Sequence, residues 1–153
     1  MLVELIKIKK VEDCDSIEEL EANIVTHQLY ISEVMKVIAS KLQYHGIIHD
    51  YTKRENIEEF WEDTRLRKED IPLEEREWIE KHITQEQHHL NLNAAPTITL
   101  IDVIEFIVDC MVTAKSTGEE VDLENLKLDP EILMTAYNNT INYIDNITIG
   151  VEK

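Results

Sequence analysis

The sequence predicts an all-α fold, a single-domain helical bundle of about five to six helices, on three observations. Its 153 residues are the length of one domain, and 43% hydrophobic residues can fill one core without crosslinks. Only three glycines and three prolines occur, so long segments run uninterrupted. We expect one domain over 1–153, with an acidic connection and a C-terminal helix in 116–153.

The first predicted helix has the clearest start signal. Ser16 and Glu19 form a capping box, after which apolar residues recur every three or four positions to about Tyr44. Gly46 is expected to end this helix, and a short helix through 49–50 is expected to follow. The first ten residues suit a short edge strand as well as a helical fragment, so both alternatives stay open.

The later elements are placed by proline and capping signals. Asp70 and Pro72 start a helix, because a proline in the first helical turn loses no hydrogen bond. Thr99 and Asp102 resemble a second capping box. The expected segments are a helix over 55–67, a helix from 72 to about 88, a loop over 91–97, a helix from 99 to about 115, a helical turn over 123–126 and a final helix over 130–144.

Charge and cysteine content restrict the partners and the location. There are 15 basic and 32 acidic residues, which gives a formal net charge of −17. A field of this sign repels phosphates, so no direct nucleic-acid binding is expected. Cys14 and Cys110 lack disulfide-scaffold spacing, and no run of about 18 apolar residues occurs. We therefore expect a reduced, cytoplasmic protein without membrane contact.

His27 interrupts the apolar stripe of the first helix. It takes the one polar place in a series of three- and four-residue steps, so its side chain is expected to point inward. On its own, a core histidine with one hydrogen-bond partner is the simpler interpretation. A role as a ligand needs further donor residues nearby. The stripe consists of Ile17, Leu20, Ile24, His27, Ile31, Val34 and Ile38.

Two further groups offer such donors. His49 and Asp50 are adjacent, and both neutral imidazole and carboxylate bind divalent transition metals. In the very apolar segment 101–112 the charged residues are spaced by three and four, which puts them on one helix face. A solvated turn and a solvated helix face are the competing interpretations. The charged residues of that segment are Asp102, Glu105 and Asp109.

A third group consists of His82, His88 and His89. Surface histidines also cluster by chance, so this group alone predicts little. The agreement of histidines, aspartates and inward-facing positions across four predicted helices favours a shared metal site.

The order of these residues resembles that of the HD-domain metal-dependent phosphohydrolase superfamily, over an HD-like core of 17–115. Members have an early histidine, an HD pair and a later helical aspartate that together hold a divalent metal. His27, His49, Asp50 and Asp109 match these positions, and Asp102 competes with Asp109 for the last place. The extra histidines of bimetallic members, and of small phage and bacterial HD-like proteins, are similar to His82, His88 and His89.

The resemblance implies hydrolysis of a small phosphorylated metabolite, in the first place a nucleotide, by metal-activated water. Histidine ligation favours one or two ions of Mn, Fe, Co or Ni. The expected catalytic residues are Asp50, Lys53, which would lie near the phosphate, and Glu105, which would orient or deprotonate the attacking water. Two alternatives stay open: an acidic interaction protein that mimics nucleic acid or binds a basic partner, and an HD domain that binds a nucleotide without turnover. Self-association also stays open.

Overall fold

The computed structural model describes residues 1–90, 95–121 and 126–151. The chain forms two compact units, one of Met1–Gln43 with Ile141–Lys153 and one of Tyr44–Thr140. Among the described residues, each unit has its own cluster of buried apolar side chains. The long helix α1 (Ile17–Ile48) belongs to the first unit up to Gln43.

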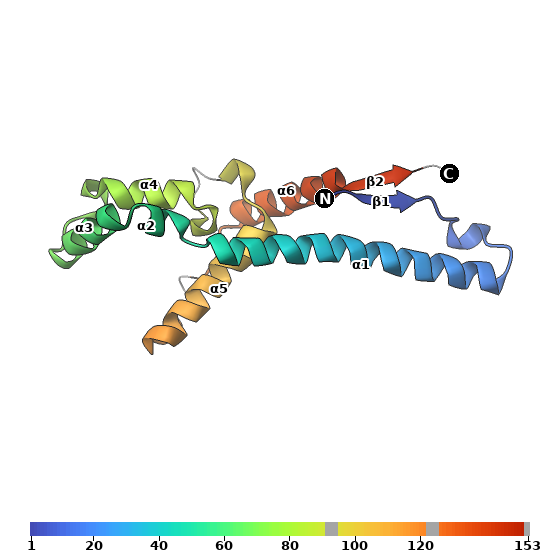
Figure 1. The fold of residues 1–153 in the computed structure, drawn as a ribbon, viewed down its shortest axis with the longest axis horizontal. Helices are drawn as coiled ribbons and strands as arrows, with labels where there is room; N and C mark the ends of the chain where they lie inside the picture. Colours follow the sequence, from blue (N-terminus) through green and yellow to red (C-terminus); the bar gives the residue numbers. More distant parts are fainter. Residues whose placement is uncertain (91–94, 122–125, 152–153) are drawn as a thin grey trace. The chain divides into compact units, whose positions relative to one another are not determined.

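The first unit combines most of α1 with a pair of short strands. Strand β1 (Val3–Ile6) pairs in parallel with β2 (Thr148–Val151), which directly follows α6 (Pro130–Ile147) (Figure 1). The helix contributes to the core and also hydrogen-bonds the strand, since the backbone N–H of Ile6 donates to the Tyr30 hydroxyl at 3.0 Å. The buried cluster of this unit consists of Val3, Val37 and Ile147.

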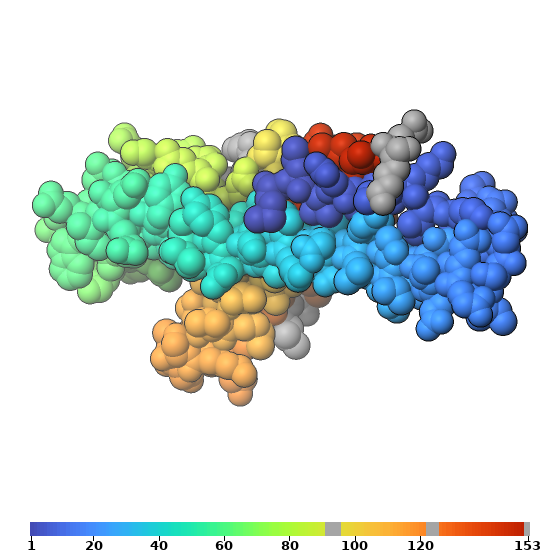
Figure 2. Space-filling model, turned by 45° about the vertical axis from the view of Figure 1, so that its right-hand side comes forward, coloured from blue at the N-terminus to red at the C-terminus, as the bar shows by residue number. Residues whose placement is uncertain are grey.

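The second unit contains the shorter helices of the middle of the chain. They are α2 (Tyr51–Glu55), α3 (Ile57–Lys68), α4 (Glu77–Gln85) and α5 (Leu100–Thr117), with short 3₁₀ turns at Leu73–Glu75, Gln87–His89 and Ala95–Thr97. Helices α3 and α4 lie side by side in Figures 1 and 2. The rings of Phe60 and Trp78 pack between them, with ring centroids 4.9 Å apart. A separate buried cluster consists of Leu90, Ile98, Val103, Ile132 and Ala136.

The all-α class is confirmed, because helices account for most of the described chain. The N-terminal segment is the edge strand rather than a helical fragment. The second capping box is also confirmed, since Thr99 and Asp102 exchange both hydrogen bonds at the start of α5. No described helix has the length and apolar character that crossing a lipid bilayer requires. The turn expected over 123–126 and the loop over 91–97 fall largely outside the described residues.

The end of α1 differs from the prediction. The helix runs through Gly46 to Ile48, because a glycine inside a helix costs only about 1 kcal/mol relative to alanine. His49 and Asp50 therefore occupy the turn between α1 and α2, and no short helix runs through them. Asp50 has a left-handed backbone with φ of 55°, which aspartate tolerates better than most residues.

Candidate metal centre

Asp50 lies at the centre of a group of histidines in the second unit. Its Oδ1 atom is 3.4 Å from His82 Nε2 and 3.6 Å from His88 Nε2. Its Oδ2 atom is 3.5 Å from His49 Nε2 and accepts a short hydrogen bond from Lys53 Nζ. These side chains come from the turn after α1, from α2, from α4 and from the 3₁₀ turn that follows α4. One carboxylate thus faces three imidazole nitrogens and one ammonium group.

Glu105 on α5 fixes the orientation of two imidazole rings and lies near a third. Its carboxylate is 2.8 Å from His45 Nδ1, 2.9 Å from His49 Nδ1 and 3.3 Å from His88 Nδ1. An ionised carboxylate only accepts hydrogen bonds, so the hydrogen bonds to Glu105 assign the hydrogens of the His45 and His49 rings to Nδ1. In the neutral rings Nε2 then carries the lone pair. Carboxylates that orient histidines in this way are the usual second layer of a metal site.

The free Nε2 atoms of two of these rings face the other carboxylates. His49 Nε2 lies 3.3 Å from Asp109 Oδ1, in addition to its contact with Asp50. His88 Nε2 is buried and has no hydrogen-bond partner among the described residues, and the same holds for Asp50 Oδ1. A buried polar atom without a partner costs about 1 to 3 kcal/mol. These two atoms, 3.6 Å apart, therefore fit a cation that both would ligate.

A relay of hydrogen bonds through Thr52 orients His82. The Thr52 hydroxyl lies 2.8 Å from Glu86 Oε1 and 2.6 Å from His82 Nδ1. Its single hydrogen goes to the Glu86 carboxylate, which also accepts the Thr52 backbone N–H at 3.1 Å. His82 must therefore donate its Nδ1 hydrogen to the Thr52 oxygen. This leaves the lone pair of His82 on Nε2, which lies 2.8 Å from His89 Nε2.

Two sets of metal-ligand atoms result, and Asp50 belongs to both. His49, Asp50 and His88 form one set, and Asp50, His82 and His89 form the other. Within each set the candidate ligand atoms lie within 4.8 Å of one another. Histidine with carboxylate suits Mn, Fe, Co, Ni and Zn better than Mg or Ca, which prefer oxygen ligands. A carboxylate shared by two histidine pairs is compatible with two ions.

A third set of close donors consists of His45, Asp102 and Glu105. It is less suited to an ion, because His45 would have to use Nδ1, which already donates to Glu105. Asp102 Oδ2 accepts from the backbone N–H and the hydroxyl of Thr99, at 2.7 and 2.6 Å. Asp102 Oδ2 therefore caps α5, whereas Asp102 Oδ1 is buried without a hydrogen-bond partner among the described residues and lies 3.6 Å from His45 Nδ1.

Burial and neighbouring charges shift the pKa values of the histidines. Burial, together with the neighbouring His89 and His49, lowers the pKa of His88 to about 3. Burial and the adjacent His82 lower the pKa of His89 to about 4. Burial acts against the charged form of His49 too, but its hydrogen bond to Glu105 and the nearby carboxylates raise its pKa. Two rings are thus neutral at neutral pH and available as ligands.

The pKa of Asp50 is held well below its ordinary value. Burial opposes ionisation of this carboxyl, but its interactions with His82 and Lys53 outweigh that effect. Asp50 is therefore an anion at any pH at which the site would bind a metal. A charged carboxylate among neutral imidazoles is the donor combination that divalent transition metals bind.

Most of the residues expected from the sequence meet here. His49, Asp50, His82, His88 and His89 supply the candidate ligand atoms, and Lys53 and Glu105 contact them. Asp109 is at the rim, with its side chain 30% exposed, and also accepts from the Thr113 hydroxyl at 3.1 Å. Between the two aspartates that competed for the last ligand place, the contact with His49 favours Asp109.

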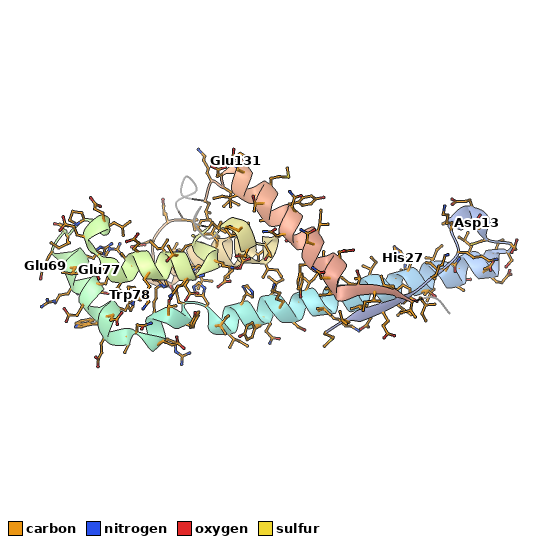
Figure 3. All side chains as sticks on the ribbon, turned by 90° about the horizontal axis from the view of Figure 1, so that it is seen from above. Asp13, His27, Glu69, Glu77, Trp78 and Glu131 are labelled. Atoms are coloured by element: carbon orange, nitrogen blue, oxygen red, sulfur yellow. The ribbon has the colours of Figure 1, made fainter. Side chains whose placement is uncertain are left out.

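His27 does not join this group. Its side chain is exposed, and it lies on the part of α1 that belongs to the other unit (Figure 3). The prediction of an inward-facing His27 is therefore wrong. The stripe that suggested burial is itself largely solvent-exposed, with Ile24 at 47% and Ile31 at 53%. Apolar periodicity identified a helix but not a buried face.

Sequence reasoning missed three residues of the site, which are His45, Thr52 and Glu86. His45 precedes His49 by four residues, and Glu86 follows His82 by four, so each pair shares a helix face. This spacing was a usable signal for both. Thr52 carried no signal of its own, because its role depends on a contact with α4, 30 residues along the chain.

Comparison with known proteins gives no relative: no protein-family model, no curated protein and no solved structure matches this chain.

Proposed function

We propose that the chain is a metal-dependent phosphohydrolase of the HD-domain type, which hydrolyses a small phosphorylated metabolite, in the first place a nucleotide. The observation that carries the proposal is the pair of buried, unpartnered atoms Asp50 Oδ1 and His88 Nε2 among four inward-facing histidines. Polar atoms are rarely buried without a partner, so their convergence supports a bound cation. The adjacent His49 and Asp50 support the HD type by resemblance.

The metal would be held by the atoms described above. His49, Asp50 and His88 would hold one divalent ion, and Asp50, His82 and His89 would hold a second. Such an ion supplies a nucleophile at neutral pH, because it lowers the pKa of bound water from about 15.7 towards 7. Asp109, at the rim beside His49, would complete the first set.

Glu105 acts by positioning in this proposal. Both of its oxygens are used by imidazole N–H groups, so the carboxylate holds the rings of His45 and His49. The sequence suggested that Glu105 would orient or deprotonate the attacking water; these contacts support a different role, the orientation of histidine rings.

Lys53 would bind the phosphoryl group in this proposal. Its ammonium nitrogen contacts Asp50, and its side chain is 30% exposed, so it can contact both the site and an incoming ligand. In a chain of net charge −17, a phosphate is attracted by local cations and not by the overall field. Lys53 together with the metal would therefore bind and neutralise the substrate's charge.

The first test is metal content. Protein purified without chelator should contain about one to two transition-metal ions per chain, and Asp50→Asn should lose them. Asparagine is chosen because it tolerates the left-handed backbone of position 50. His27→Ala is the matched control, since it removes an exposed histidine outside the site and should leave the metal content unchanged. A folded protein that takes up no added Mn²⁺, Fe²⁺, Co²⁺ or Ni²⁺ would rule out the hydrolase.

The second test is turnover. The Mn²⁺-loaded protein should release phosphate or pyrophosphate from at least one nucleotide in a panel of mono-, di- and triphosphates. Lys53→Ala should raise KM or lower kcat for that nucleotide while metal content stays the same. Metal and nucleotide binding without turnover on any member of the panel would favour the non-catalytic HD domain instead.

A further inference from the structure

Helices α3 and α4 line a cavity that contains none of the candidate metal ligands. This cavity of about 1040 Å³ is lined by the outer residues of α3, by the 3₁₀ turn Leu73–Glu75 and by the start of α4. Two basic residues, Arg76 and Lys81, face six carboxylates around it. These carboxylates are Glu58, Glu59, Glu62, Asp63, Glu75 and Glu77. The local charge therefore repels phosphates and attracts cations.

Asp63 in this cavity has a buried oxygen that lacks a donor. The residue is only 5% exposed, and its Oδ2 is 3.4 Å from Arg76 Nη1, a long distance for a charge-assisted hydrogen bond. Neither Asp63 Oδ1 nor Arg76 Nε has a hydrogen-bond partner in the part of the chain that is described. Two residues of the cavity lining thus contain buried atoms without a partner there: a charged acceptor, Asp63 Oδ1, and a donor, Arg76 Nε.

Trp61 provides an exposed aromatic face at the same cavity. Its ring is 62% exposed although tryptophan is usually well buried, and the Lys68 ammonium lies 5.7 Å from the ring centroid. The ring therefore already has a cation near it and has area for another. A planar guanidinium group can stack on an indole ring and at the same time donate to a carboxylate. An ammonium group also donates to carboxylates, but it has no planar face to stack on the ring.

We propose that this cavity binds an arginine side chain from a basic segment of a partner protein. The guanidinium would stack on Trp61 and donate to Asp63 Oδ1, and a backbone carbonyl of the segment would accept from Arg76 Nε. This last contact favours a peptide over a polyamine, because a polyamine has no acceptor. The proposal is independent of hydrolysis at the metal centre, since none of the candidate metal ligands lines the cavity.

The test measures binding of a fluorescent peptide with spaced arginines to the full-length protein by anisotropy. The same peptide with lysine in place of arginine, and spermine, serve as comparison ligands. We expect the arginine peptide to bind at least about tenfold more tightly than the lysine peptide, and its affinity to fall with salt. Asp63→Asn and Trp61→Ala should each weaken it by about tenfold or more.

Glu69→Gln is the matched control, because Glu69 follows the end of α3, is exposed and does not line the cavity (Figure 3). It changes the net charge as much as Asp63→Asn and should leave binding almost unchanged. Equal affinity for both peptides, preference for spermine, or equal losses in the Glu69 and Asp63 variants would overturn the proposal. If Asp63→Asn fails to fold, Trp61→Ala decides, since its ring is mostly in solvent.

Discussion

The Nε2 atoms of His82 and His89 lie 2.8 Å apart. The relay through Thr52 puts the lone pair of His82 on this nitrogen, so His89 must donate the hydrogen between them when no ion is present. When the hydrogen of His89 moves to Nδ1, both Nε2 lone pairs become available to one cation. The contact is therefore a hydrogen bond that a metal ion can replace.

The relay predicts that Thr52 controls metal affinity without being a ligand. Thr52→Val removes the oxygen that accepts from His82 Nδ1 and keeps the volume of the buried side chain. We expect the affinity for the ion at His82 and His89 to fall by about 10- to 100-fold, as measured by calorimetric metal titration.

Thr84→Val is the control for this change. Thr84 is exposed on the same helix, α4, and its hydroxyl donates only to carbonyls of its own helix. Thr84→Val should leave the affinity for each of the two metal ions unchanged. If Thr52→Val also left both affinities unchanged, the assignment of the His82 hydrogen to Nδ1 would be wrong.

The depressed histidine pKa values predict acid sensitivity of the metal-free protein. In the unfolded chain His88 and His89 take up protons below about pH 6.5, whereas in the folded chain they do so only near 3 and 4. Between these values the unfolded state binds more protons, so the free energy of unfolding falls as pH falls from about 6.5 to 4. Protonation of Asp50 lowers the free energy of unfolding further at still lower pH, because the pKa of Asp50 is also depressed in the folded state.

His49 acts with the opposite sign. Its raised pKa stabilises the folded state below about pH 6.5, and this contribution is lost as pH rises through the folded pKa. The melting temperature of the chelated protein should therefore be highest near pH 6.5 to 7 and fall more steeply on the acid side. Scanning calorimetry from pH 4 to 8 would measure this, and a flat profile on the acid side would contradict the burial of His88 and His89.

Glu105 predicts a measurable change in the titration of His49. Glu105→Gln keeps a hydrogen-bond acceptor but removes the negative charge that helps to raise the pKa of His49. The pKa of His49 should therefore drop in the metal-free variant, as followed by NMR titration of its ring protons. An unchanged His49 pKa would show that Glu105 does not orient this ring.

The sequence predicted much of this site because its signals were local. Two of these signals do not depend on tertiary structure. They are the adjacency of His49 and Asp50 and the four-residue spacing of Glu105 and Asp109. His45 was missed because Gly46 was expected to end the helix, which hid its four-residue spacing from His49.

Non-local contacts explain the remaining errors. The same face of α5 carries residues with different roles, since Asp102 caps the helix while Glu105 orients histidines. Spacing alone cannot separate these roles, because they depend on what packs against each carboxylate. Likewise, the stripe that contains His27 is apolar, yet much of it is exposed.

The two aspartates of α5 can be separated by experiment, because one should affect stability and the other metal binding. Asp102→Ala leaves the buried N–H and hydroxyl of Thr99 without an acceptor, which should cost about 1 to 3 kcal/mol of unfolding free energy. Metal stoichiometry should not change, since Asp102 belongs to neither set of ligands that includes Asp50.

Asp109→Ala should change the free energy of unfolding by no more than about 0.5 kcal/mol, because the residue is at the rim, but it should weaken the binding of the ion at His49. Urea denaturation of the chelated proteins gives the first quantity and metal titration the second. Loss of metal in the Asp102 variant with no loss in the Asp109 variant would reverse the assignment and make the His45, Asp102 and Glu105 set the ion site.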